Sequence, residues 1–355
     1  PHLRGPPAGD RHPVRSPPTP PSRMHESRLE TLLRQFSGKH VVVIGDCMLD
    51  EYVWGKVSRI SPEAPVVVVE HDRTTYAAGG ASNVAANIVA MGARACIVSV
   101  VGDDGMGDRL RRELEAQGVC HDGLVIDSAR PTTVKTRVLA HSQQVVRVDR
   151  EERSPVAPEV ETALIEQIRR ALARADAVLF SDYTKGVLTE RVAGAALQIA
   201  RELGKPAFAN PKPSSLSVYK GLSLVTLNQS ETEAATGLSL AGTEVLPEAG
   251  QRLLRFCGAE TAIVTLGGRG LALFEQGKPW RHLPVIPLEV YDPCGCGDST
   301  IAAAALARVS GGDWVEAATV ANLAGNAKVR KLGVVPVGRE DIRHVFALGE
   351  AAGAN

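Results

Sequence analysis

The sequence has little of several features that mark large classes of protein. Its 355 residues include no apolar run of the roughly 20 residues that a membrane-spanning helix needs, and the first residues hold no apolar segment typical of a secretory signal. Aromatic residues make up 4% of the chain, and the formal net charge is +0. A chain without excess positive charge has no general attraction for nucleic acid or acidic membranes. We therefore expect neither as a partner.

Cysteine is also scarce, and its placement argues against the common metal-binding modules. The 6 cysteines stand at positions 47, 96, 120, 257, 294 and 296. No pair has the two-residue gap of a zinc knuckle or a thioredoxin-like motif, and the 9 histidines include no HExxH pattern. Dispersed cysteines in a long chain indicate reduced thiols, so we expect a cytoplasmic protein.

Proline is concentrated at one end of the chain. Residues 1–23 contain eight of the 22 prolines and few apolar residues, and such a segment cannot bury enough surface to offset the entropy lost on ordering. We expect a disordered tail there. An amphipathic helical pattern follows Met24, so we expect Met24 to be the natural start and residues 24–355 to form a single domain.

From residue 40 onward, strand patterns alternate with helix patterns. Short β-branched runs lie at 41–44, 97–101, 177–180, 223–227 and 261–265. Helical patterns lie at 81–91, 107–117, 158–173, 189–203 and 243–256. This alternation predicts an α/β fold in which helices cover both faces of a parallel sheet.

Two regions break the alternation. Residues 52–57 with 66–70, and residues 133–139 with 145–149, read as strands without a helix between them, and apolar and polar residues alternate along them. Such strands form either a small separate sheet that covers a site as a lid, or an edge extension of the main sheet. The sequence leaves both arrangements open.

The strongest candidate site is the segment DPCGCGDST at residues 292–300, which precedes a run of small residues. Gly295 and Gly297 permit a tight turn, and the run behind them favours a helix. A glycine loop that leads into a helix N-terminus presents free N–H groups to an anion. Asp298, in the first turn, is then either a general base beside a bound phosphate or an ordinary helix cap. The local pattern does not distinguish these roles.

Other polar residues follow predicted strands, where ligands bind in open α/β sheets. Asp46 and Asp50 follow the first strand, and a glycine pair precedes a helix that carries Asn83. Asn228 and Glu231 follow a later strand, and Glu231 is a candidate for Mg²⁺ or for a carboxylate that satisfies a helix N-terminus. A TLGGRG loop suits a nucleotide contact or a hairpin turn. No Walker A or dinucleotide-binding pattern occurs in the sequence.

Together these motifs resemble the ribokinase-like (PfkB) carbohydrate kinases over most of residues 39–342. The glycine pair with its asparagine, the NxxE motif, the TLGGRG loop and the GxGD signature occur in that family's order. Within the family, the chain is similar to bacterial kinases of D-glycero-β-D-manno-heptose 7-phosphate, most specifically in the segment SRISPEAPV at 58–66 and also in SDYTKG at 181–186. The resemblance implies a ribokinase-like three-layer sandwich with a mostly parallel central sheet and a small β-sheet lid, near 52–70 and 132–149.

The resemblance also implies a reaction. Phosphoryl transfer from ATP, with Mg²⁺, to the anomeric (C1) hydroxyl of the heptose 7-phosphate would give the 1,7-bisphosphate in ADP-heptose biosynthesis. The GxGD aspartate is the family's base, which corresponds to Asp298, and the backbone N–H groups of Gly295, Cys296, Gly297 and Asp298 would bind the transferred group. The residues implied or chosen for the sugar phosphate are Asp46, Asp50, Gly79, Gly80, Asn83, Lys135, Arg137, Gln144, Arg147, Asp182 and Lys185. Those for the nucleotide are Asn228, Glu231 (also through Mg²⁺, directly or via water), Thr265, Gly267, Gly268, Gly270 and Asn322.

Four residues depart from the usual family pattern. Cys294 and Cys296 replace the threonine and the alanine of the usual TGAGD, and Cys296 is large enough to crowd the anion site. Asn210 replaces an aspartate, and Leu227 a proline. Because both glycines and Asp298 are retained, we expect an active kinase. A kinase for another sugar phosphate and a catalytically silent sugar- or nucleotide-binding relative are the alternatives.

Two further expectations concern the whole protein. The bifunctional relatives carry a nucleotidyltransferase with an HxGH motif, and no such motif occurs here, so we expect phosphorylation alone. The lid strands place apolar residues such as Val53, Val66 and Val68 where an exposed strand edge invites pairing, so we expect a homodimer.

Overall fold

A computed structural model describes residues 24–140, 143–286 and 289–353 of the chain; the proline-rich segment at 1–23 lies outside these ranges. Its main feature is a nine-stranded sheet with the order β13-β12-β11-β10-β9-β8-β1-β4-β5. The strands are β1 (His40–Gly45), β4 (Arg94–Val101), β5 (Cys120–Ile126), β8 (Ala177–Ser181), β9 (Ala207–Asn210), β10 (Leu224–Asn228), β11 (Thr261–Thr265), β12 (Leu271–Glu275) and β13 (Arg281–Leu283). All pair in parallel except β12 and β13, which pair antiparallel at one edge.

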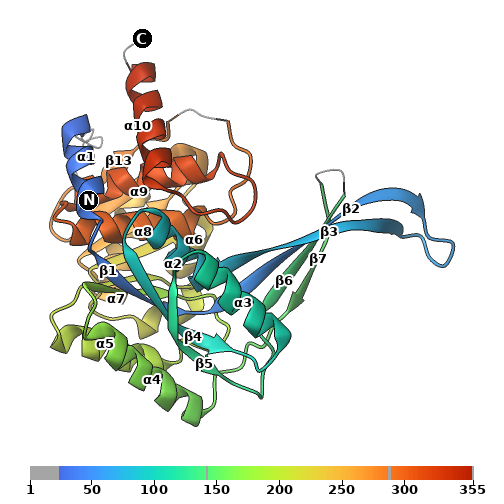
Figure 1. Ribbon diagram of the computed structural model, residues 1–355. Helices are drawn as coiled ribbons and strands as arrows, with labels where there is room; N and C mark the ends of the chain where they lie inside the picture. Colours follow the sequence, from blue (N-terminus) through green and yellow to red (C-terminus); the bar gives the residue numbers. More distant parts are fainter. Residues whose placement is uncertain (1–23, 141–142, 287–288, 354–355) are drawn as a thin grey trace, which may run out of the picture.

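Helices cover both faces of this sheet (Figure 1). One face carries α1 (Glu26–Gln35), α2 (Ala81–Ala90), α3 (Gly105–Ala116), α8 (Cys296–Val309), α9 (Trp314–Lys328) and α10 (Arg339–Gly353). The other carries α4 (Pro158–Leu172), α5 (Glu190–Glu202), α6 (Gln229–Thr236), α7 (Leu246–Cys257) and the 3₁₀ turn Pro213–Val218.

Strand β1 shows why the sheet is covered on both faces. Its residues Val41 and Val43 pack into one hydrophobic core, and Val42 and Ile44 pack into the other. Successive side chains of a strand point to opposite faces, so a strand buried on both sides needs an unbroken apolar run. The three-layer sandwich predicted from the sequence is confirmed.

The remaining strands form a separate four-stranded sheet that projects from the body (Figure 1). Its order is β3-β2-β6-β7, with β2 (Cys47–Ile60), β3 (Val67–Gly80), β6 (Val134–Ala140) and β7 (Gln143–Arg150). Strands β2 and β6 are parallel, whereas the two outer pairs are antiparallel. The structure therefore has the separate lid and not the edge extension that the sequence also allowed.

Candidate active site

The glycine loop feeds a helix as predicted. Gly295 precedes α8 with a φ of 79°, a left-handed conformation that glycine adopts without strain. The N–H groups of Gly295, Gly297 and Asp298 donate to no acceptor in the described part of the chain, whereas Cys296 N–H is used in a turn to Pro293 O (3.2 Å). Three of the four predicted backbone donors are therefore free at a helix N-terminus, where the helix dipole favours an anion.

Asp298 lies buried in the first turn of α8 but does not cap its own helix. Its Oδ2 accepts a hydrogen bond from Asn83 Nδ2 (2.7 Å), and its Oδ1 accepts one from the hydroxyl of Tyr183 (2.7 Å). Burial raises the pKa of Asp298 to about 6, although the two donors oppose the shift. This geometry leaves a carboxylate poised near neutral pH and excludes the simple capping role.

Asp298 faces a polar cavity of ≈ 530 Å³. The lining residues come from the carboxyl ends of four neighbouring strands, β8 to β11, and from the glycine loop; they include Tyr183, Asn210, Lys212, Asn228, Glu231, Thr265, Gly267, Gly295, Cys296, Gly297 and Asp298. Parallel strands end at one edge of a sheet, and side chains from that edge converge there.

Within this cavity, Glu231 is held on both sides. Its Oε1 accepts from Lys212 Nζ (2.6 Å), and its Oε2 accepts from Asn228 N–H (3.0 Å). Asn228 in return caps α6 by accepting from the N–H of Glu231 (2.8 Å), so the two residues form a capping box. Glu231 thus has the helix-terminal role that the sequence left open, and its carboxylate also lines the cavity.

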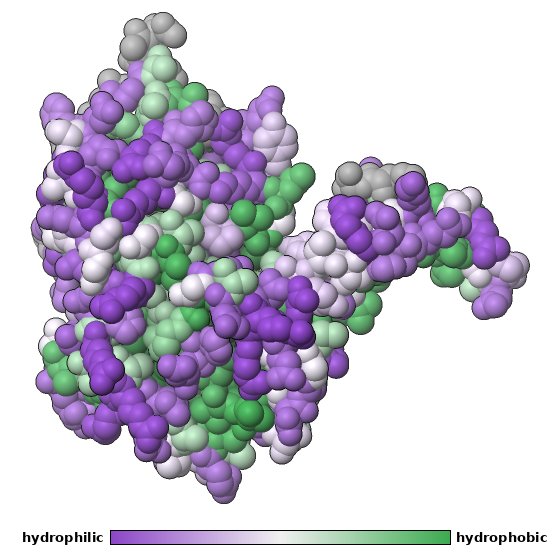
Figure 2. Space-filling model, in the orientation of Figure 1, coloured by the Kyte–Doolittle hydropathy of each residue, from purple (hydrophilic) through white to green (hydrophobic). Residues whose placement is uncertain are grey.

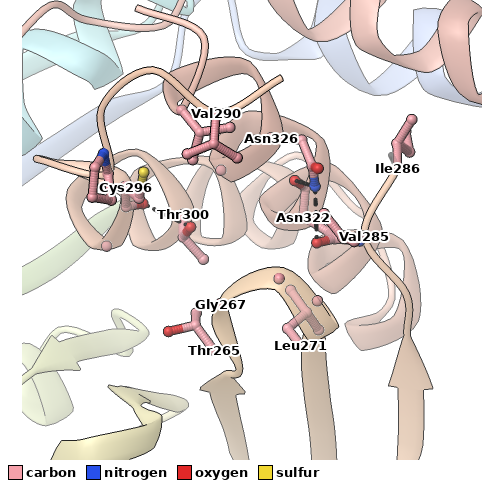
Figure 3. Close-up of a pocket in the computed structure, with 16 residues that line it drawn as sticks. Thr265, Gly267, Leu271, Val285, Ile286, Val290, Cys296, Thr300, Asn322 and Asn326 are labelled. Carbon is pink, nitrogen blue, oxygen red and sulfur yellow. Dashed lines mark hydrogen bonds between the residues drawn. The ribbon is translucent and has the colours of Figure 1, made fainter. Parts of the chain in front are cut away.

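A second cavity of ≈ 390 Å³ adjoins the first and is largely apolar. Figure 3 shows Leu271, Val285, Ile286 and Val290 around it, with Asn322 on α9. Gly268 and Gly270 line it too, and Thr265, Gly267, Cys296 and Gly297 line both cavities. The predicted nucleotide residues therefore lie along one cleft, apolar at one end and polar at the other.

The side chain of Asn322, which was predicted to contact the nucleotide, is already hydrogen-bonded within the protein. Its side-chain amide donates to Pro284 O (2.8 Å), and its carbonyl groups accept from Asn326 Nδ2. These bonds fix Asn322 against the wall of the apolar cavity; Figure 3 shows Asn322 beside Asn326 there.

On the lid side of Asp298, Asp50 pairs with Arg137 across β2 and β6. Burial raises the pKa of Asp50, while Arg137 and Lys135 oppose the shift. Gly79 makes room for this pair, and Gly80 follows it at the start of α2. A Cβ at position 79 would lie 2.1 Å from Asp50 Oδ2, and Gly80 precedes α2 with a φ of 57°.

Three of the predicted phosphate-binding cations gather nearby, though each has an acidic partner. Lys135 Nζ lies 3.1 Å from Asp149 and 3.7 Å from Glu151, and Lys185 Nζ lies 2.7 Å from Glu151. Arg147 pairs with Asp149 at 2.9 Å. Lid and body thus meet in one charged cluster. Gln144, by contrast, is exposed on β7, and no contact joins it to the cluster within the described residues.

Two predicted sugar ligands have other roles. Asp46 accepts from the backbone N–H groups of Tyr183, Lys185 and Val187 at 2.8–3.2 Å. Asp182 accepts from Thr184 N–H and from the hydroxyl of Tyr219. Both carboxylates are buried, and these bonds use much of their accepting capacity. The geometry therefore assigns them to the support of the loop after β8 rather than to direct contact with sugar.

Cys296 does not fill the anion site. It is half-buried, as is Cys294, and it lines both cavities while the neighbouring N–H groups stay free. Burial raises the pKa of the Cys294 thiol, and that of Cys296 to about 11. Both cysteines are therefore neutral thiols beside the loop at physiological pH.

The prediction missed three residues near Asp298. Tyr183 binds Asp298 directly, Lys212 lies in the polar cavity, and Lys328 is wholly buried with its Cε 3.6 Å from where a Cβ of Gly295 would be. Tyr183 stands in the quoted SDYTKG segment and Lys212 follows Asn210-Pro211, so local motifs could have drawn attention to both. Lys328 sits in a helical pattern with no local signal.

The chain belongs to the pfkB family carbohydrate kinases, whose model matches residues 38–339. It is therefore a carbohydrate kinase, as predicted. In the described residues, no helix is both long enough and apolar enough to cross a membrane.

Among curated relatives, the bifunctional protein HldE of Pelobacter propionicus is 39% identical over 328 residues, which cover 92% of this chain and 67% of that protein. The bifunctional protein HldE of Bradyrhizobium diazoefficiens is 41% identical over 316 residues, covering 88% and 64%. The chain thus spans about two thirds of the length of these relatives.

Among solved structures, the ribokinase of Arabidopsis thaliana complexed with ribose and ATP superposes with a TM-score of 0.67 at 21% identity, covering 87% of this chain and 98% of that one. A likeness at this identity concerns the fold. It agrees with the ribokinase-like sandwich and lid predicted from the sequence.

Proposed function

We propose that this kinase transfers the γ-phosphoryl group of ATP to the C1 hydroxyl of D-glycero-β-D-manno-heptose 7-phosphate. The observation that carries the proposal is the placement of Asp298. It is a buried carboxylate beside three backbone N–H groups that have no acceptor among the described residues, at the polar end of a cleft whose other end is apolar. A base next to an anion site is the pair of elements that phosphoryl transfer to a hydroxyl requires.

The cleft suits a nucleotide in one orientation. An adenine ring matches the apolar end around Leu271 and Ile286, and the phosphates match the polar end with Lys212 and the glycine loop. The γ-phosphoryl group then reaches the N-terminus of α8, where N–H groups and the helix dipole stabilise negative charge.

Magnesium fits this arrangement as an ion carried by the nucleotide. Mg²⁺ commonly takes one or two protein carboxylates and completes its shell with phosphates and water. Glu231 supplies one carboxylate at the polar end, and Lys212 would exchange its Glu231 contact for a phosphate. The ion would neutralise charge on the phosphates during transfer.

The acceptor belongs on the lid side of Asp298. The Asp50 and Asn83 side chains are suited to sugar hydroxyls, and the cluster of Lys135, Arg147 and Lys185 lies where lid and body meet. A phosphate on the sugar would take over these cations from Asp149 and Glu151, because charge-assisted bonds to phosphate are strong. The SRISPEAPV segment in the lid supports a heptose phosphate as this substrate.

The mechanism follows from these positions. The sugar hydroxyl gives its proton to Asp298 while its oxygen bonds to the γ-phosphorus, and the bond from that phosphorus to the β-phosphate oxygen breaks to release ADP. The N–H groups of Gly295, Gly297 and Asp298 hold the transferred group, and Lys212 offsets charge on the nucleotide side. The lid helps to keep water from the phosphoryl group.

An ADP-release assay with a panel of sugar phosphates tests the proposal. We expect turnover of the heptose 7-phosphate and a loss of about 10²- to 10⁴-fold in kcat for Asp298→Asn. Asp313→Asn is the matched control, because Asp313 is a true helix cap at α9 and should keep activity. Preference for another sugar phosphate would overturn the substrate, and near wild-type activity of Asp298→Asn would overturn the base. ATP binding without any turnover would favour the silent relative.

A further inference from the structure

The loop that follows β8 is held by two buried carboxylates. Asp46 accepts from three of its backbone N–H groups, those of Tyr183 (2.8 Å), Lys185 (3.1 Å) and Val187 (3.2 Å). Asp182 accepts from Thr184 N–H (2.8 Å) and from the Tyr219 hydroxyl (2.9 Å). Five donors thus fix a short segment that contains no regular secondary structure.

Holding the loop in this shape costs free energy, because it buries a carboxylate and imposes uncommon backbone conformations. Burial and the nearby charge of Asp182 raise the pKa of Asp46 to about 6. Thr184 has a φ of 54°, which is uncommon for a residue other than glycine. A Cβ at Gly186 would lie 1.9 Å from Ser154 O, so only glycine fits there. Such strain persists where the surroundings determine the conformation, and it concentrates at functional sites.

The result of this shape is the position of one hydroxyl. The side chain of Tyr183 lines the polar cavity and donates to Asp298 Oδ1 at 2.7 Å. The ring also lies 5.2 Å from Lys212 Nζ, a cation–π distance. Tyr183 therefore stands between the base and the nucleotide side of the cleft, in contact with both.

We infer that Tyr183 is a positioning residue for the catalytic base, and that its hydroxyl holds Asp298 Oδ1 so that the carboxylate stays ionised and correctly turned toward the sugar hydroxyl. This inference rests on the proposed function and names a residue that lies outside the GxGD signature. Asn83 holds the other oxygen, Oδ2, at 2.7 Å. One donor on each oxygen restrains rotation of the carboxylate, and Asp298 also lines the cavity, where each oxygen keeps capacity for another donor.

Several charged or titratable groups bear on Asp298 besides Tyr183. Asp50 on β2 disfavours ionisation, whereas Lys212, after β9, favours it. Arg137 of β6 pairs with Asp50, and Lys328 of α9 lies near Gly295. Cys294 and Cys296, beside the loop, are neutral thiols whose pKa burial raises. All of these groups stay in place when only the Tyr183 hydroxyl is removed, so a change in titration would report that hydroxyl.

The test is the pH profile of kcat/KM for Tyr183→Phe, which keeps the ring and removes the donor. We expect the acid limb to move to higher pH by about one to two units, since hydrogen bonds to charged groups are strong. Activity at pH 7 should fall about 2- to 10-fold and return close to the wild-type value near pH 9. The sugar phosphate titrates identically in both assays, so it does not contribute to the difference.

Tyr219→Phe is the matched control. It also removes a buried tyrosine hydroxyl that donates to a carboxylate, but that carboxylate is Asp182, so the variant loses one of the five donors that fix the loop and keeps the four backbone donors and the bond from Tyr183 to Asp298. The control therefore separates the Tyr183 hydrogen bond from support of the loop in general. We expect its acid limb to coincide with that of the wild type. An unmoved limb in Tyr183→Phe, or a loss that is equal at every pH, would overturn the inference.

A second measurement separates this inference from the proposed reaction. The carbon NMR signal of the Asp298 carboxyl group, identified by its absence in Asp298→Asn, titrates in the unliganded protein. We expect its pKa to rise in Tyr183→Phe and to stay unchanged in Tyr219→Phe. A wild type that phosphorylates no sugar phosphate would contradict the proposed function alone, whereas an unchanged pKa in Tyr183→Phe would contradict the inference alone.

Discussion

At the scale of single residues, Asp298 is ionised where burial opposes its charge. Its pKa of about 6 lies above the value of 3.8 for a free carboxyl, mainly because of burial. A carboxyl whose pKa is higher in the folded state binds protons more tightly there, so folding stability falls as pH rises from about 4 through 6. If Asp298 is the base, as proposed, it lowers stability at the pH at which it acts, a common relation at catalytic sites.

The variant Asp298→Asn should reveal how much folding stability the ionised Asp298 costs. Asparagine does not titrate, so the stability of the variant relative to the wild type should increase across this pH window and level off above pH 7. The gain can reach about 3 kcal/mol, which follows from a shift of about two pKa units. Melting temperatures of both proteins at pH 4, 5, 6 and 7.5 measure it. Asp46 titrates in both proteins, so its contribution cancels when their stabilities are compared. A stability difference that does not vary with pH would contradict the pKa assigned to Asp298.

At the scale of elements, the sequence predicted those whose pattern is strong and local. The strand at 261–265 and the helix at 81–91 appear as β11 and α2, because their apolar residues are buried in the expected rhythm. Strand β9 was missed because Ala207–Asn210 is only four residues long and holds two alanines. The lid strands β2 and β3 were predicted too short, since their ends at Cys47 and Gly80 are buried beside the main sheet and lack the alternation of their exposed parts.

The residues of the candidate site also divide into those that the sequence located and those that it did not. Asp298 and the glycine loop carry their signal in consecutive residues, so the sequence located them. Asp46 and Asp182 look like ligands from their place after strands, yet both point into a loop, and only the three-dimensional path of residues 182–187 shows this. Tyr183 reaches Asp298 across 115 positions of sequence, a contact that no local pattern reports.

The junction of β3 with α2 offers a prediction at this scale. In Gly79→Ala the new Cβ would lie 2.1 Å from Asp50 Oδ2, and Asp50 is buried against Arg137 and cannot move aside freely. We expect a loss of about 1–3 kcal/mol in stability and a higher KM for the sugar, with the KM for ATP unchanged. Chemical denaturation and steady-state kinetics measure both effects.

Gly194→Ala is the control for this change. Gly194 lies within α5, and no heavy atom lies within 4 Å of its added Cβ. Alanine there should stabilise the protein by about 0.5–1 kcal/mol and leave both KM values alone. A Gly79→Ala variant that behaves like this control would show that the Asp50 carboxylate is not confined as the structure indicates.

At the scale of the whole molecule, the main sheet and the lid divide the work. The carboxyl ends of β8, β9, β10 and β11 lie side by side and supply the cleft, while the lid supplies Asp50 and Arg137 on the side where we propose that the sugar binds. The faces of the lid differ. Strand register groups Lys135, Arg137, Arg147 and Asp149 on one face, and the other face carries Val53, Val138, Val146 and Val148.

The apolar face of the lid leads to the last prediction, a homodimer. Val146 and Val148 are 47% and 56% exposed, and Figure 2 shows hydrophobic side chains on the surface of the projecting lid. An apolar sheet face on a thin projection is poorly covered by its own chain, and a second copy would bury it. Light scattering should give twice the chain mass of 37.6 kDa. The double variant Val146→Glu/Val148→Glu should be monomeric, whereas Leu203→Glu, an equally exposed apolar site on α5's end, should not change the mass. A monomeric wild type would contradict the dimer, and a dimeric double variant would contradict this face as its interface.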